Sequence, residues 1–312
     1  SHMGVIEVTG RGARAFLDRL ATCCVRDLPA GRARYGLMLN PAGGVLDDVL
    51  VYALADERLW VVANAANAAR DLRWMAEHAG LDVSCTSHFG EVAILALQGP
   101  RALAIAAVAL RREFNALRRF HFGTWREGEG EVLASRTGYT GEDGLEFFCP
   151  ASMAEALWER LLRAGKNEGL LPCGLGARDV LRIEAGNVLY GHEIDEETTP
   201  VDANLMWAVH LDKGDFIGRE ALLAAQAAGP RRLRCGLVVE ERAIPREGAP
   251  VGAGEQACGV VTSGTFSPTL QKGIAMAYLA PSHAEAGRPV WVELRGKRRA
   301  ARIVSLPFYR RH

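Results

Sequence analysis

Residues 41–52 read PAGGVLDDVLVY, a turn-like Pro-Ala-Gly-Gly that runs into apolar, mostly β-favouring residues. Val, Leu and Tyr suit an extended backbone and the Gly-Gly pair bounds the segment, so residues 45–52 are predicted to be a strand. The apolar stretch YGLMLN at 35–40 precedes the same turn, and the two stretches predict a hairpin. This hairpin, followed by alternating helical and strand-like segments, indicates an α+β fold with mainly antiparallel sheets.

Two adjacent carboxylates, Asp47 and Asp48, interrupt this otherwise apolar strand. Successive side chains of a strand point to opposite faces, so each face holds one carboxylate. Burying an unpaired carboxylate is costly or raises its pKa, so at least one of the two needs an arginine, a backbone amide or a ligand as its partner. On the pattern alone, a structural ion pair or a half-exposed strand is the more frequent explanation, with a binding site as the alternative.

Composition limits the possible classes of protein. The chain has 312 residues, enough for two or three domains, and its 49% hydrophobic and 24% charged residues are ordinary for a soluble globular protein. A formal net charge of zero argues against a general nucleic-acid binder. No apolar run approaches the length of a membrane span and no secretory signal is visible, so we expect a cytoplasmic protein. The seven cysteines lack repeated CxxC spacing, which favours reduced thiols over disulfides or a zinc site.

Helical and strand patterns alternate over the first two thirds of the chain. Apolar spacing predicts helices at 12–23, 67–79, 99–110, 151–165 and 176–186. After AAGPRR, a plausible linker, short strands and turns dominate, and they predict a small β-barrel or sandwich. We therefore expect two regions, 1–227 with two intertwined α+β lobes and 228–312 with the barrel.

Two segments carry candidate chemistry. The loop SRTGYTGEDGLEFF at 135–148 holds three glycines and a tyrosine, which would let the backbone approach a ligand closely, although a long surface loop is an equal alternative. In the segment 173–200, Arg178 lies in the first turn of a helix, where the helix dipole disfavours a cation, so a carboxylate partner is expected. His192 and its acidic neighbours match no strong metal signature, so no metal site is expected. The basic run RGKRRAAR at 295–302 suits a solvated strand edge better than nucleic-acid binding.

An ordered set of motifs resembles one family over nearly the whole chain. These are MLNPAGGVLDDVLVY, VVANAAN, LQGP, SRTGYTGEDGLEFF, GLGARDVLRIEAGNVLYGHEIDEETTP, DFIGREAL, VTSGTFSPTL with IAMAYL, and PFYR. Together they resemble the T-protein family of the glycine cleavage system, the aminomethyltransferases. The resemblance implies a three-lobed cloverleaf around a central channel, with a C-terminal barrel. It also implies transfer of an aminomethyl carbon from the lipoyl group of a partner, the H-protein, to tetrahydrofolate, with release of ammonia and formation of methylene-tetrahydrofolate.

The resemblance also assigns roles to residues. It makes Asp48 the catalytic carboxylate facing the folate pterin, while Asp47 keeps a structural partner. A fixed carboxylate in a poorly solvated site would stabilise cationic charge on the transferred carbon. Glu146 and Arg178 would contact folate, with Glu146 on the pterin N–H groups and Arg178 on a carboxylate such as the glutamyl tail. The other expected contacts are Tyr35, Tyr52, Tyr139, Tyr190 and Tyr309, with Asn64 and Trp207 as weaker ones.

The sequence departs from the family pattern in three places. Several dozen residues usually precede SHMG, so we expect an N-terminal segment to be missing, with a divergent, naturally short paralogue as the alternative. Ser-His-Met is either the scar of a cleaved expression tag or native sequence. Cys23-Cys24 replace an Asn-Asp pair, and Gln271 replaces a usual glycine, which could alter one tight turn.

Two alternatives stay open at this stage. A tetrahydrofolate-dependent demethylase or methyltransferase would use the same folate pocket with a small methylated substrate. A non-enzymatic folate-binding relative is disfavoured, because LYGHEID stands where a KGCYxGQE-type segment is typical and because Asp48 is intact.

Overall fold

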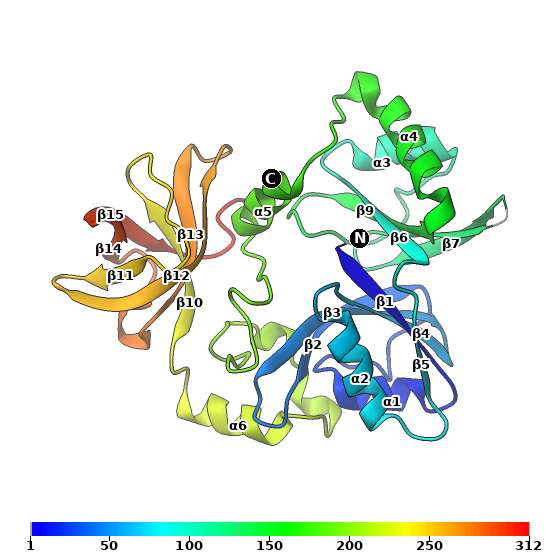
Figure 1. Ribbon diagram of the computed structural model, residues 1–312, viewed down its shortest axis with the longest axis horizontal. Coiled ribbons are helices and arrows are strands. Elements are labelled where there is room, and N and C mark those ends of the chain that lie inside the picture. Colours follow the sequence, from blue (N-terminus) through cyan, green and yellow to red (C-terminus); the bar gives the residue numbers. More distant parts are fainter. Residues whose placement is uncertain (1, 129, 312) are drawn as a thin grey trace.

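The computed structural model describes residues 2–128 and 130–311. It is a mixed α+β structure whose strand pairs within the named sheets are all antiparallel, which confirms the predicted fold class. Figure 1 shows three lobes, each built around one sheet. None of the helices in the described ranges is long and apolar enough to cross a membrane.

The first lobe is a five-stranded sheet in the order β2-β3-β4-β1-β5. Its strands are β1 Met3–Thr9, β2 Arg32–Leu39, β3 Val45–Ala55, β4 Arg58–Asn64 and β5 Ser84–Ser87. The helices α1 Ala13–Leu20 and α2 Ala68–His78 pack their apolar sides into one core with β1, β3 and β4. The predicted hairpin is confirmed as β2 and β3, in a register that sets Leu37 opposite Asp48 and Met38 opposite Asp47.

The second lobe is a four-stranded sheet in the order β6-β9-β8-β7. Its strands are β6 Val92–Gln98, β7 Phe122–Glu127, β8 Gly130–Ser135 and β9 Gly144–Pro150. The helices α3 Ala102–Leu110 and α4 Ala154–Gly165 share a core with this sheet. The Gly-rich loop of residues 136–143 joins β8 to β9, so both ends of the loop are fixed by neighbouring strands.

The third lobe is a closed six-stranded barrel in the order β10-β13-β12-β11-β14-β15, as the strand-rich C-terminal text predicts. Its strands are β10 Leu233–Val239, β11 Pro250–Ala253, β12 Gln256–Ser267, β13 Lys272–Leu279, β14 Pro289–Leu294 and β15 Lys297–Val304. Alternate residues of these strands fill an apolar interior. Gln271 lies in the turn between β12 and β13 with a φ of 55°, the left-handed region that favours glycine.

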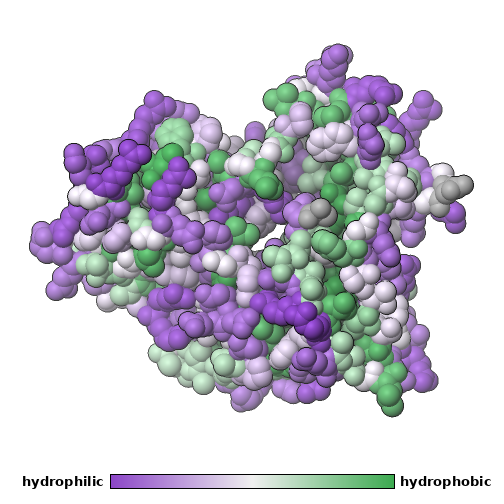
Figure 2. Space-filling view, viewed as in Figure 1, coloured by the Kyte–Doolittle hydropathy of each residue, from purple (hydrophilic) through white to green (hydrophobic). Residues whose placement is uncertain are grey.

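The long segment between the second lobe and the barrel holds the lobes together (Figure 1). It contains α5 Leu175–Glu184, which packs against β12 and β13, and α6 Arg219–Ala228. Within this segment, short 3-10 turns occupy Lys166–Glu168, Met206–Ala208 and Leu211–Lys213. Elsewhere, similar turns occupy Ala151–Met153 before α4 and Pro281–His283 in the barrel region. Residues of this segment, including Val188, Ile194 and Phe216, form a core with Leu37, Leu39 and Val45 of the hairpin. Figure 2 shows a hollow between the barrel and the other two lobes.

Candidate functional site

A cavity of about 540 Å³ lies where the three lobes meet. Its wall mixes apolar and aromatic side chains with a few charged ones, as is typical of small-molecule sites. The hairpin contributes Tyr35 and Asp48, β4 contributes Asn64, and β9 contributes Glu146. Arg178 of α5 and Trp207 complete this group. Seven of the expected site residues therefore line one cavity, namely Tyr35, Asp48, Asn64, Tyr139, Glu146, Arg178 and Trp207.

Asp48 is the carboxylate of the hairpin that faces this cavity. Its Oδ2 accepts a hydrogen bond from the Tyr35 hydroxyl at 3.0 Å, and its Oδ1 accepts one from Asn64 Nδ2 at 2.9 Å. Burial and then the negative charge of Asp47 raise the pKa of Asp48 to about 7, while the hydrogen bonds from Asn64 and Tyr35 work in the opposite direction. A carboxyl with that pKa can exchange a proton near neutral pH.

Asp47 points away from the cavity and is fully buried. It accepts hydrogen bonds from the Asn64 backbone N–H at 3.0 Å, from Asn64 Nδ2 at 2.7 Å and from Asn67 Nδ2 at 2.8 Å. The expected structural partner is thus a set of amide donors from the end of β4 and the start of α2. The same Asn64 side chain donates to both aspartates, which ties the two faces of β3 together.

Aromatic rings flank the carboxylate. The Tyr35 ring stacks on the Trp207 indole with 5.3 Å between centroids and 16° between planes, and 68% of the Trp207 side chain remains exposed. The guanidinium of Arg178 lies 4.6 Å from the centre of the Tyr139 ring, and the Tyr139 hydroxyl donates to the carbonyl of Val188. Flat faces of this kind can pack against a planar heterocycle.

Glu146 is a second buried carboxyl at the cavity wall, 9% exposed. The Thr137 hydroxyl donates to its Oε2, and the Tyr52 hydroxyl lies 3.1 Å from Thr137 Oγ1. Burial raises the pKa of Glu146, an effect that the hydrogen bond from Thr137 and the positive charge of Arg178 oppose. Glu146 therefore presents an acceptor next to a guanidinium, an arrangement that suits a ligand edge with both donors and acceptors.

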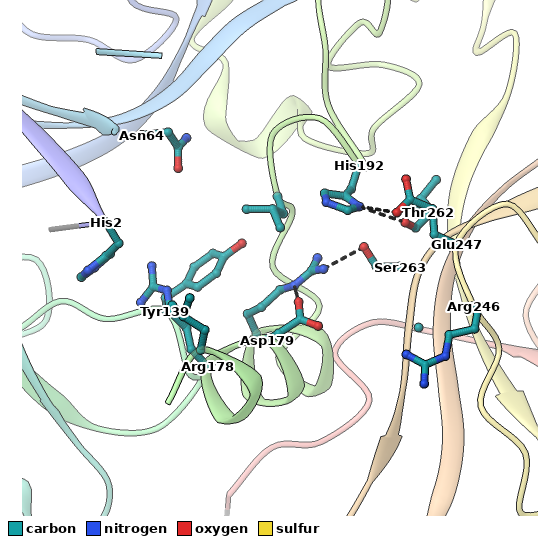
Figure 3. Close-up of a pocket in the computed structure, with 14 residues that line it drawn as sticks. His2, Asn64, Tyr139, Arg178, Asp179, His192, Arg246, Glu247, Thr262 and Ser263 are labelled. Carbon is teal, nitrogen blue, oxygen red and sulfur yellow. Dashed lines mark hydrogen bonds and ion pairs between the residues drawn. The ribbon is translucent and has the colours of Figure 1, made fainter. Parts of the chain in front are cut away.

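A second cavity, of about 610 Å³, adjoins the first and shares Asn64, Tyr139 and Arg178 with it. Figure 3 shows its residues: the side chain of His192 faces Glu247 across 3.2 Å, and α5 lines the floor. Beneath it the buried Arg182 donates to Asp179 at 2.8 Å and to Ser263 at 2.8 Å. The wall of this cavity is richer in charged side chains than that of the first.

Three of the expected tyrosines are not among the residues that line either cavity. Tyr52 is fully buried and reaches the first cavity only through Thr137. Tyr190 accepts a hydrogen bond from Arg70 at 2.9 Å. The backbone N–H of Tyr309 donates to the carbonyl of Glu184. Pro307 and Arg310, close to Tyr309 in the sequence, do line the first cavity.

Arg234, which no sequence motif singles out, also lines the first cavity. Arg234 is 6% exposed, and its guanidinium donates to the carbonyls of Ala203 and Gly186 at 2.7 and 2.9 Å. In the sequence Arg234 belongs to the basic run RRLR that follows the linker, and such a run predicts a solvated stretch. Within the described ranges, no group of three or more acidic, histidine or cysteine side chains is arranged to hold a metal ion.

Comparison with known proteins gives one consistent result. Residues 1–213 match the family described as "GCVT N-terminal domain", and residues 231–310 match "Glycine cleavage T-protein C-terminal barrel domain". Proteins described as "Aminomethyltransferase" are similar along the entire chain: that of Geobacillus kaustophilus is 46% identical and that of Prosthecochloris aestuarii 42%, each over 100% of this chain and 86% of the relative. A crystal structure of the glycine cleavage system aminomethyltransferase T from Bartonella henselae superimposes with a TM-score of 0.92 at 38% identity, over 99% of this chain and 84% of that one.

Proposed function

The chain belongs to the glycine cleavage T-protein family and is an aminomethyltransferase of the glycine cleavage system, and from this premise we propose how its two cavities bind the two substrates. The family uses tetrahydrofolate. We place tetrahydrofolate in the 540 Å³ cavity and the lipoyl arm of a partner H-protein in the adjoining one. The two would meet beside Asn64, which lines both cavities. We assign the folate region to residues 1–227 and the barrel domain to 228–312.

The composition of the first cavity supports the folate assignment. A pterin is flat and carries N–H donors beside a carbonyl oxygen, so it needs aromatic or apolar faces and a polar edge. Tyr35 with Trp207 and Tyr139 supplies the faces, while Glu146 supplies acceptors for the N–H groups. Arg178 donates to an oxygen of the folate, either on the ring or on the glutamyl tail. The volume lies within the range of about 300–1,000 Å³ that is usual for such ligands.

Asp48 supplies the chemistry of the transfer step. In the reaction the carbon–sulfur and carbon–nitrogen bonds of the aminomethyl group break and two bonds form from its carbon to tetrahydrofolate nitrogens, while the two protons of those nitrogens leave with the sulfur, as the dihydrolipoyl thiol, and with the ammonia. Positive charge develops on the carbon as the leaving groups depart. The ionised Asp48 carboxylate, held by Tyr35 and Asn64, stabilises that charge in a cavity with little bulk water. With its pKa raised to about 7, the same carboxyl can also accept a proton from a folate nitrogen.

The second cavity suits the other substrate. The wall of this cavity carries three arginines beside the carboxylates of Asp179 and Glu247, so the position of the cavity next to the folate site, and not its charge, supports the assignment. The two cavities adjoin each other, because they share Asn64, Tyr139 and Arg178. A lipoyl arm that enters the second cavity would therefore reach the folate without crossing the core of the first lobe. This arrangement lets each substrate bind from its own side.

The observation that carries the proposal is the convergence of Asp48, Glu146 and Arg178 on one cavity from three different elements. Calorimetric titration with tetrahydrofolate tests it. Arg178→Ala is expected to weaken binding by about tenfold to a hundredfold, the loss of one charged hydrogen-bonding partner. Arg163→Ala, on the exposed face of α4, is the matched control and should bind as the unmodified chain does. Equal binding by both variants would contradict the folate assignment.

A second measurement distinguishes the one-carbon donor. We expect formation of methylene-tetrahydrofolate only with aminomethylated, lipoyl-bearing H-protein. Turnover of a small methylated amine without H-protein would instead support the demethylase alternative.

A further inference from the structure

The second aspartate of the hairpin belongs to a buried acid pair. Asp71, in the first turn of α2, is 1% exposed, and Asp47 is fully buried. Burial, the negative charge of Asp47 and a hydrogen bond with its carboxyl group raise the pKa of Asp71 to about 9, against the opposing effect of the Arg70 guanidinium beside it. Two carboxyl groups in such contact cannot both ionise, because a hydrogen bond between them requires a proton on one.

The contacts decide which member carries the proton. Asp47 accepts three hydrogen bonds from amide N–H groups of Asn64 and Asn67. In the described part of the chain, neither carboxyl oxygen of Asp71 receives a hydrogen bond from a nitrogen or hydroxyl donor. Arg70 Nε lies 3.6 Å from Asp71 Oδ1, too far for a hydrogen bond. Amide donors stabilise an anion, so Asp47 holds the charge and Asp71 holds the proton.

This pair reaches the cavity through one amide group. Asn64 Nδ2 has two hydrogens; one goes to Asp47 Oδ1 at 2.7 Å and the other to Asp48 Oδ1 at 2.9 Å. If repulsion displaced the Asp47 side chain, Asn64 would lose the contact that orients its amide, and Asp48 would then lose a donor to its ionised form. By contrast, the oxygen kept by Asp47→Asn still accepts from Asn64 Nδ2.

We propose that Asp71 is a positioning residue whose neutral carboxyl keeps Asp47 ionised and in place, and that Asp47 in turn orients Asn64 and sets the charge of Asp48. The inference rests on the proposed role of Asp48 and extends it to two residues that do not touch the cavity. Asp71 donates its proton to Asp47, and Asp47 accepts from Asn64, which donates to Asp48.

Other charged and titratable groups of the described chain lie around these contacts, and Glu146, Arg178 and Arg234 line the same cavity as Asp48. Tyr35 and Tyr139 face Asp48 from β2 and from the Gly-rich loop. Around the acid pair, Arg70 lies beside Asp71, and Tyr190 and Glu196 interact with Arg70. Arg70 also donates to the carbonyl of Leu46, one residue before Asp47. These groups are unchanged in the variants below, so each comparison isolates the acid pair.

The pH dependence of the transfer rate is one test. In the unmodified protein the rate should fall at alkaline pH as Asp71 loses its proton and is repelled by Asp47. Asp71→Asn keeps a neutral donor that cannot ionise, so its acid limb should be unchanged. The rate at pH 9.5 divided by the rate at pH 8 should be about four times larger in Asp71→Asn than in the unmodified protein, as expected when a group with a pKa near 9 no longer ionises.

Removing the charge of the pair should act on Asp48 directly. The Asp47 and Asp48 oxygens that bind Asn64 Nδ2 lie less than about 6 Å apart, where a like charge raises a pKa by roughly one to two units. The double variant Asp47→Asn/Asp71→Asn should therefore move the acid limb of the rate profile down by about that amount. Asp18→Asn is the matched control: it changes another buried aspartate, bonded to Arg26 outside both cavities, and should move neither limb.

Infrared spectroscopy reads the proton without relying on activity. At pH 8 the carbonyl band of a protonated carboxyl should be present in the unmodified protein and retained in Asp48→Asn, and it should fall to a small remainder in Asp71→Asn, where about one Asp48 in eleven is still protonated. A band of unmodified strength in Asp71→Asn overturns the inference, as do pair variants whose rate profiles match that of Asp18→Asn. Full activity of Asp48→Asn would contradict the proposed function instead, and the infrared band would still decide whether the pair exists.

Discussion

Tyr35→Phe removes one hydrogen bond from the Asp48 carboxyl, for which we propose the catalytic role, and little else. The Tyr35 hydroxyl donates to Asp48 Oδ2 at 3.0 Å, while the ring itself stacks on Trp207. Phenylalanine keeps that stacking surface. The hydroxyl stabilises the ionised form of Asp48 and so lowers its pKa, against the larger upward effect of burial. The variant should therefore raise the pKa of Asp48 above its value of about 7.

The size of the effect follows from the hydrogen bond. A bond to a charged group contributes about 1.5–3 kcal/mol, and water admitted by the missing hydroxyl recovers part of it, which leaves about 1.4 kcal/mol, or one pH unit. At pH 7 the ionised fraction of Asp48 then falls from about one half to about one in eleven. If the ionised form is the active one, the transfer rate falls about fivefold at pH 7 and less than twofold at pH 9.

The assay is the initial rate of methylene-tetrahydrofolate formation from saturating aminomethylated H-protein, measured from pH 5.5 to pH 9. The acid limb should move to higher pH by about one unit. Tyr278→Phe is the matched control, because it removes a buried hydroxyl of β13 that donates to the Glu193 carbonyl and lines neither cavity. An acid limb that stays in place, or moves to lower pH, would refute the assignment of that limb to Asp48.

Three further predictions concern binding and stability. Glu146→Gln should weaken tetrahydrofolate binding by about tenfold or more, since the amide replaces one acceptor of a buried carboxyl bonded to Thr137; a titration that matches the unmodified chain would count against its role. Gln271→Gly should raise the free energy of unfolding by up to about 1 kcal/mol, because the residue has a φ of 55°, and chemical denaturation would show the midpoint moving up rather than down. Asp71→Asn should become more stable relative to the unmodified chain as pH rises from about 4 to about 9. The raised pKa of Asp71 means that the folded state of the unmodified chain holds a proton which its unfolded state has released. The unmodified chain therefore loses stability as pH rises through this range, while Asp71→Asn does not. A difference in the free energy of unfolding that does not change with pH would contradict the acid pair with Asp47.

Sequence reasoning located the hairpin and its two carboxylates because both depend on local rules. Strand alternation places Asp47 and Asp48 on opposite faces whatever the rest of the chain does, and the register of β2 with β3 agrees. Turn residues and apolar runs also indicated most of the barrel strands. The short β11, Pro250–Ala253, lacks such a local signal, because proline and glycine occupy half of it and only its pairing with β12 and β14 makes it a strand.

The contacts that define the site are long-range, and the sequence does not reveal them. Nothing local to Asp71 shows that it lies against Asp47, because that contact depends on how α2 packs on the first sheet. Arg234 reaches the cavity only because the barrel closes beside the segment after α5. Tyr52 lies beneath the cavity wall although it belongs to one of the motifs that resemble the family. The sequence pattern would be the same for a tyrosine that lines the cavity.

The most direct test of the central claim is the transfer rate of Asp48→Asn, measured together with its affinity for tetrahydrofolate. The substitution preserves shape and hydrogen-bonding capacity toward Tyr35 and Asn64 but removes the charge. The rate should fall by about a hundredfold to a thousandfold, as when one electrostatic stabiliser of a transition state is lost, with folate affinity changed less than tenfold. A variant that binds tetrahydrofolate and transfers the carbon at the unmodified rate would show that another group does this work.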